Sequence, residues 1–176
     1  MLSSALLAIA ACAATVLADP YTFTVASQSG MFNYNPEKRR ANVNLTNFWH
    51  QDYTVVQAGE PDAHYGSPGK GDQIMWNTGA TGDAAPSVKY SFTGAGIAFR
   101  GYWGAPRQAA SSQAAVELVV DGQSTTFNGV DGPADTLVML ANATLENGNH
   151  DVELILRTGD VSILFIDVTL DFPDIP

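Results

Sequence analysis

Residues 88–97 read VKYSFTGAGI, and this stretch decides the fold prediction. Val88, Tyr90 and Phe92 alternate with polar residues, a period of two that puts the three apolar side chains on one face of an extended strand. The glycine-rich Thr93–Gly96 that follows has the composition of a tight turn, because glycine adopts backbone conformations that other residues avoid. The stretch therefore predicts a half-buried strand that ends in a turn and leads into a second strand.

The same alternation recurs along the chain, and each run is short and rich in β-branched or aromatic residues. The further runs are Tyr21–Val25, Ala95–Trp103, Val116–Val120, Val152–Leu156 and Leu164–Leu170, with a shorter strand at Gln73–Trp76. Turn-forming residues separate them at Asp121-Gly122, Asn128–Gly132, Asn147–Asn149 and Thr158–Asp160. No segment shows a sustained helical period, and Ala105–Ala115 lacks an apolar stripe, so we interpret it as a loop. Many short strands predict an all-β chain, an antiparallel β-sandwich or jelly roll.

Composition narrows the functional classes. The chain has 176 residues and a net charge of −10, from 18 acidic and 8 basic side chains. An acidic surface repels phosphate backbones, so we expect no nucleic-acid partner. Charged residues make up only 15% and hydrophobic residues 45%, which favours one packed domain over disorder. A single cysteine can form neither an internal disulfide nor a cysteine-based zinc site.

The first residues have the composition of a secretory signal. Residues 1–18 read MLSSALLAIAACAATVLA, without a charged side chain, and the small residues before Asp19 fit a signal-peptidase site after Ala18. The alternative is a buried N-terminal helix or strand. We expect a signal peptide over 1–18, a single domain over 19–176, no membrane span, and export to the extracellular space or cell wall. Sequons at Asn44 and Asn142 predict a glycoprotein and fit this interpretation.

Four segments carry a family resemblance: YSFTGAGI at 90–97, VELVVDGQ at 116–123, LENGNHDVEL at 145–154 and LFIDVTL at 164–170. Their order resembles the galactose-binding-domain-like jelly-roll β-sandwich of secreted fungal proteins, which is similar to carbohydrate-binding modules. The resemblance covers about half of the chain. It implies a β-sandwich and a carbohydrate ligand, although the matching residues specify turns and strands rather than a site, and fold does not imply function.

Sugar binding needs a flat apolar surface for the ring and a few fixed polar groups for its hydroxyls. The predicted ligand-binding residues lie in glycine- and proline-rich loops or at strand ends: Tyr65, Trp103, Arg107, His64 and Arg100. Trp103 and Tyr65 can equally be core or plain surface residues. For Trp49 and Trp76 a place in the core is the favoured interpretation.

No cofactor is expected, with one possible exception. The resemblance to jelly-roll carbohydrate modules implies that an aspartate at the position of Asp167 can ligate a structural calcium ion. Calcium needs six to eight oxygen ligands, and the first strand, Tyr21–Ala26, offers no acidic partner. Enzyme signatures are missing: the histidines have no metal-ligand spacing, and no nucleophile-elbow, phosphate-loop or zinc-protease motif occurs. We expect no enzyme, although paired carboxylates leave a small hydrolase open.

Lys38-Arg39-Arg40 is the one basic cluster, either a processing site that would release 19–40 or a solvated turn. The sequence as a whole predicts a secreted, non-catalytic module whose partner is a neutral glycan or cell-wall polysaccharide. The alternative is a structural or protein-interaction module without a sugar site, and a small hydrolase is a third class.

Overall fold

The computed structural model describes residues 20–35, 37–38, 49–54, 72–78, 85–105, 108–134 and 136–171. These residues form ten strands and no helix. The strands are β1 (Tyr21–Ala26), β2 (Asn33–Asn35), β3 (Glu37–Lys38), β4 (Trp49–Thr54), β5 (Asp72–Thr78), β6 (Ser87–Tyr102), β7 (Ala115–Val120), β8 (Gln123–Asn128), β9 (Val138–Thr158) and β10 (Asp160–Leu170). The predicted signal segment, 1–18, lies outside the described residues. Within the described part of the chain, no helix is long and apolar enough to cross a membrane.

The strands form one hydrogen-bonded sheet in the order β3-β4-β5-β10-β6-β9-β7-β8, with β1 beside β10 and β2 beside β6. The pairs are antiparallel except β3 and β4, which run parallel over two residues. β1 pairs with β10 over its whole length and inserts Phe23 and Val25 against the core. The predicted all-β antiparallel fold is therefore confirmed. The sheet includes β1 and β2, which lie in the segment 19–40 that processing at Lys38-Arg39-Arg40 would release.

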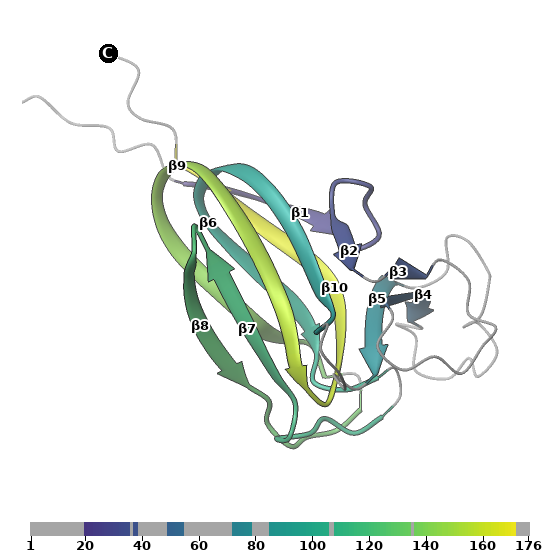
Figure 1. Ribbon diagram of the computed structural model, residues 1–176. Helices are drawn as coiled ribbons and strands as arrows, with labels where there is room; N and C mark the ends of the chain where they lie inside the picture. The colour runs from purple at the N-terminus through teal and green to yellow at the C-terminus, as the bar shows by residue number, and fades with distance from the viewer. Residues whose placement is uncertain are drawn as a thin grey trace, which may run out of the picture.

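The sheet becomes a sandwich because its two longest strands fold over. β6 has 16 residues and β9 has 21, and they stay paired around the bend. Gly94 pairs with Gly148 but Gly96 pairs with Thr144, so β9 places residues 145–147 opposite the single residue Ala95. A bulge of this kind bends its strand and increases the local twist. Figure 1 shows β6 and β9 curving over together at one end of the molecule, which puts the two halves of each strand in different layers.

Two predicted turns are wrong, and at Gly94 the glycine is needed for a different reason. Thr93–Gly96 lies inside β6 and Asn147–Asn149 inside β9, where the backbone continues through the bend instead of reversing. A Cβ atom on Gly94 would lie 2.5 Å from the carbonyl oxygen of Thr169, so glycine permits a close approach between backbones. The predicted turn at Asp121-Gly122 is confirmed: both residues have positive φ, 50° and 82°, as a two-residue hairpin turn requires.

The core lies between the two layers and follows the predicted alternation. In β6 the buried Val88, Tyr90 and Phe92 alternate with exposed polar residues, and β10 contributes the fully buried Ile166 and Val168. Trp49 is also fully buried, with its ring 5.2 Å from that of Tyr34, so its predicted place in the core is confirmed. On the first half of β6 this packing leaves the opposite face free for polar side chains, whereas β10 is buried on both faces.

The bend generates the first prediction. Gly94→Ala should lower the free energy of unfolding by about 1–3 kcal/mol, because the new methyl group would overlap the Thr169 carbonyl oxygen. Urea denaturation followed by tryptophan fluorescence measures the loss. Gly30→Ala is the matched control, since a Cβ atom there meets nothing within 4 Å. Equal midpoints for the two variants would contradict the proposed reason for Gly94.

Candidate functional site

Three cross-strand pairs form a polar row on the outer surface of β6 and β9. The register places Lys89 opposite Glu153, Ser91 opposite Asp151, and Thr93 opposite Asn149. These side chains face outward because they alternate with the buried residues of the same strands. We call the six residues the polar face.

Each pair of the polar face is joined by its side chains. The Ser91 hydroxyl donates to Asp151 Oδ1 at 2.6 Å, and the Thr93 hydroxyl donates to Asn149 Oδ1 at 2.5 Å. Lys89 Nζ lies 3.4 Å from Glu153 Oε2. Cross-strand pairs of this kind hold one another in place, so the row presents hydroxyl, amide and carboxylate groups in a fixed arrangement.

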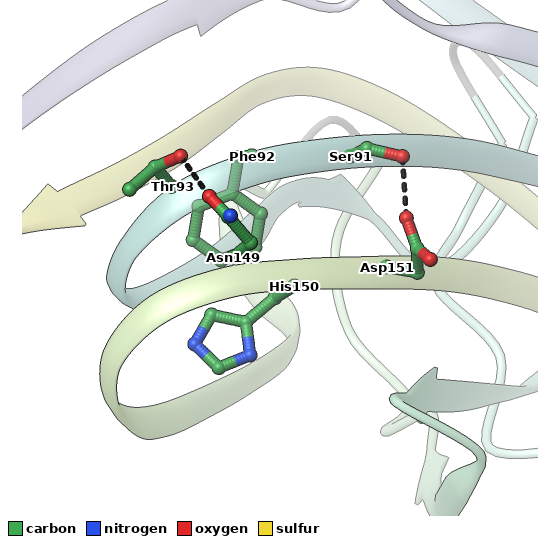
Figure 2. A pocket seen from close by; sticks show the side chains of 6 residues that line it. All are labelled: Ser91, Phe92, Thr93, Asn149, His150 and Asp151. Atoms are coloured by element: carbon green, nitrogen blue, oxygen red, sulfur yellow. Dashed lines mark hydrogen bonds between the residues drawn. The ribbon is translucent and has the colours of Figure 1, made fainter.

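The polar face lines two adjoining depressions of the surface. The first, of about 350 Å³, is lined by Ser91, Phe92, Thr93, Asn149, His150 and Asp151 and is shown in Figure 2. The second, of about 320 Å³, shares Ser91 and Asp151 with it and extends to Lys89 and Glu153. The shared residues make the two depressions one continuous surface along the strands.

A histidine on the opposite side of β9 supports this face. Figure 2 shows the His150 ring directed away from the two hydrogen-bonded pairs. Its Nδ1 lies 2.7 Å from Asp121 Oδ2, in the β7–β8 turn, and its Nε2 lies 2.9 Å from the carbonyl oxygen of Glu146. Asp121 also binds the backbone of Asp151, accepting from its N–H at 2.9 Å and donating its own N–H to the Asp151 carbonyl at 3.0 Å.

The protonation states follow from these contacts. Hydrogen bonding to Asp121 raises the pKa of His150 above its usual value of 6.5, against an opposing effect of burial, and the Glu146 carbonyl raises it further. The same bond with His150, and then the Asp151 N–H, hold the pKa of Asp121 below its usual 3.8. The imidazolium and the carboxylate thus stabilise each other's charged forms.

Of the ligand-binding residues predicted from sequence, the structure describes Trp103 and Arg100. Trp103 is 4% exposed and packs in the core, so its ring offers no open surface for a sugar. Arg100 is exposed on the other layer, where it pairs with Asp167. His64, Tyr65 and Arg107 lie outside the described residues. Their role in ligand binding therefore stays a prediction.

Of the two predicted glycosylation sites, Asn44 lies outside the described residues. Asn142 is exposed on the first half of β9, opposite Ala98 of β6. This half of β9 belongs to the other layer, away from the polar face. A glycan on Asn142 would therefore leave the polar face uncovered.

The surroundings of Asp167 do not fit a calcium site. Its Oδ1 accepts a hydrogen bond from Thr24 at 2.6 Å, and its Oδ2 lies 2.6 Å from Arg100 Nε. A cation already neutralises the carboxylate, whereas calcium requires several further oxygen ligands. The described residues hold no group of three or more histidine, cysteine, aspartate or glutamate side chains that could bind a metal ion. Asp167 instead ties β10 to two of its neighbouring strands, β1 and β6.

Sequence reasoning missed the polar face, although part of its signal was present. Ser91 is an outward residue of the stretch that decided the fold prediction, and Asp151 precedes the alternation at Val152–Leu156. Alternation identifies outward positions on each strand separately. It does not say which two strands pair or in which register, and the site exists only because β6 and β9 are neighbours.

The comparisons with known proteins concern fold. No protein-family model matches the chain. No curated protein matches it either. A solved structure of a family two carbohydrate esterase from Cellvibrio japonicus is 16% identical, with a TM-score of 0.45, over 89% of this chain and 37% of that chain. The chain therefore spans little more than a third of that esterase.

Carbohydrate-binding modules are also among the similar structures. The C-terminal CBM6 module of LamC, from Zobellia galactanivorans, is 13% identical with a TM-score of 0.45, over 85% of this chain and 99% of that chain. The module CBM36, solved with calcium and xylotriose, is 20% identical with a TM-score of 0.33, over 58% of this chain and 82% of that chain. The function proposed below rests on this chain's own side chains.

The Asp167 contacts generate the second prediction. Asp167→Ala should lower the free energy of unfolding by about 1–3 kcal/mol, because the change leaves a buried site without its carboxylate and Thr24 and Arg100 without their acceptor. Urea denaturation measures it. Glu117→Ala, in the more exposed pair with Arg157, should cost less. A melting temperature that falls on adding EDTA would contradict this account, because it would mean that a metal ion and not Arg100 neutralises Asp167.

Proposed function

We propose that this protein is a secreted, non-catalytic module that binds a neutral carbohydrate through the polar face. The observation that carries the proposal is the row of three paired polar residues across two adjoining depressions. Sugars present many hydroxyl groups, and the hydroxyl, amide and carboxylate groups of this row can donate to and accept from them. Because the row is built on paired strands, its geometry exists before the ligand arrives.

The charge of the chain favours a neutral ligand. The polar face holds the carboxylates of Asp151 and Glu153 against the single cation of Lys89. The whole chain carries −10. An acidic polymer would meet repulsion at the site and during approach, whereas a neutral glycan would not.

The geometry supports binding rather than catalysis. A hydrolase with a serine nucleophile would use Ser91 at this face, and the Ser91 hydroxyl is bonded to a carboxylate and not to a histidine. His150 cannot act as its base, because both ring nitrogens are engaged on the far side of β9. The group within hydrogen-bond reach of the Ser91 hydroxyl is the Asp151 carboxylate, and carboxylates are weaker bases than the imidazole that usually activates a serine nucleophile.

Secretion and the remaining predicted contacts complete the proposal. We assign residues 1–18 as the signal peptide and Asn142 as a glycosylated residue. His64, Tyr65 and Arg107, which lie outside the described residues, stay predicted ligand contacts. The partner is a cell-wall or extracellular glycan, and no bound metal is needed.

A specific observation keeps a protein-interaction module as the second candidate. Val130, Leu137 and Met139 are 59%, 48% and 51% exposed, and they lie close together along the chain around the start of β9. Large exposed apolar side chains are the kind of surface that protein partners cover. A module of this kind would bind a protein and show no retention on polysaccharides.

The third prediction tests the polar face. Ser91→Ala and Asn149→Ala should each weaken retention on a neutral polysaccharide by about tenfold, the effect of losing roughly 1.4 kcal/mol of hydrogen bonding. Affinity electrophoresis and pull-down on insoluble xylan, mannan and β-1,3-glucan measure it, and polygalacturonate serves as the acidic polymer that should not bind.

The control for this experiment is Thr22→Ala. Thr22 belongs to a similar hydroxyl pair, with Thr169 at 3.0 Å, on β1 and β10 of the other layer. Its variant should be retained like the unchanged protein. Equal loss in Ser91→Ala and Thr22→Ala would count against the polar face, and no retention on any neutral polysaccharide would overturn the proposed function.

A further inference from the structure

We infer that protonated His150 positions Asn149 and Asp151 by joining the β7–β8 turn to the bulge of β9. Binding at the polar face then depends on pH, a consequence that rests on the proposed function. His150 is a positioning residue in this inference, since its ring does not point to the polar face (Figure 2).

The partners of the ring determine its protonation state. Nδ1 faces a carboxylate oxygen of Asp121 and Nε2 faces the backbone carbonyl oxygen of Glu146. Both partners are acceptors only. A neutral imidazole carries one N–H and can satisfy one of them, whereas the imidazolium carries two and satisfies both. The ring of Phe92, 5.5 Å away, packs against the imidazole from β6.

The two contacts of the ring reach the residues on either side of it. Asp121 holds both backbone groups of Asp151, whose side chain in turn accepts from Ser91. Glu146 belongs to the bulge that comes directly before Gly148 and Asn149. Loss of either contact would free one end of the segment that carries the two polar-face residues.

Few charged groups face His150. Asp121 approaches from the β7–β8 turn, and on β9 itself the neighbouring ionisable side chains are Glu146 and Asp151. β6 contributes the Phe92 ring and the backbone of Gly94, neither of which titrates. The imidazolium therefore contacts one carboxylate, that of Asp121, and backbone acceptors, and none of these residues carries a cation that would oppose its charge.

The direction of the pH effect follows from the two pKa shifts. The raised pKa of His150 means that its stabilising contribution is complete below pH 6.5 and is lost as the pH rises through the folded-state value. The lowered pKa of Asp121 means that its contribution is complete above pH 3.8 and is lost as the pH falls through its own folded-state value. The contact is therefore strongest between about pH 3.8 and 6.5 and weakens on the alkaline side.

The fourth prediction tests the positioning role of protonated His150 without any ligand. In an NMR titration of the full chain, the His150 ring should titrate above pH 6.5, and the backbone amide signals of Asn149 and Asp151 should shift with it. Asp121→Asn should lower the His150 pKa and make the two amides exchange faster with solvent. Asp131→Asn is the matched control, because Asp131 accepts a backbone hydrogen bond from Ser112, has a lowered pKa, and has no histidine partner.

Two results would overturn the inference: a His150 ring that titrates at or below pH 6.5, or amides of Asn149 and Asp151 that ignore its titration. If Asp121→Asn does not fold, the titration of the unchanged protein still decides the question, with His150→Gln used to assign the ring signal. Retention on insoluble xylan, mannan and β-1,3-glucan should fall as the pH rises from 6 to 9. Retention that stays constant with pH would overturn the pH dependence of binding. A protein that is not retained at any pH would overturn the proposed function but not the positioning role of His150.

Discussion

The close approach of β6 to β10 at Gly94 is the constraint on which the rest of the structure depends. Only a residue without a side chain leaves room there for the carbonyl of Thr169, 2.5 Å from where a Cβ atom would lie. At this level β6 and β9 pass from one layer to the other, and the extra residues of β9 take up the difference in length. The two layers, the core between them and the outer polar face all follow from that crossing.

The same bend connects the fold to the candidate site. The bulge that lets β9 turn also supplies the Glu146 carbonyl to His150, and the strand resumes at once with Asn149 and Asp151. The β7–β8 turn reaches the other nitrogen of the ring because Asp121 adopts a positive φ, a conformation that aspartate tolerates better than most residues. The β9 bulge and the β7–β8 turn, which are separated in the sequence, are thus joined by the titratable side chain of His150.

Local chemistry accounts for what could be predicted from sequence. The alternation at Val88–Phe92 and the Asp121-Gly122 turn identify strands and a hairpin, because the side-chain period and the turn conformation are properties of a few adjacent residues. The bend at Gly94 could not be told from a turn, since glycine suits both and the difference lies in Thr169, a residue far along the chain. The polar face was missed for the same reason: it depends on register between strands separated by more than fifty residues.

The burial of Trp103 changes what kind of recognition the described residues can support. Stacking of a sugar on an exposed indole would provide much of the affinity at a single position. The polar face instead offers hydrogen bonds, each of which contributes little in net terms because water competes for the same groups. A surface of this kind gains affinity from repeated contacts along an extended ligand, and the two depressions share residues along the strands as such a ligand would require. Under the proposed function we therefore expect a polymer rather than a single sugar, since several weak contacts on one chain reinforce one another.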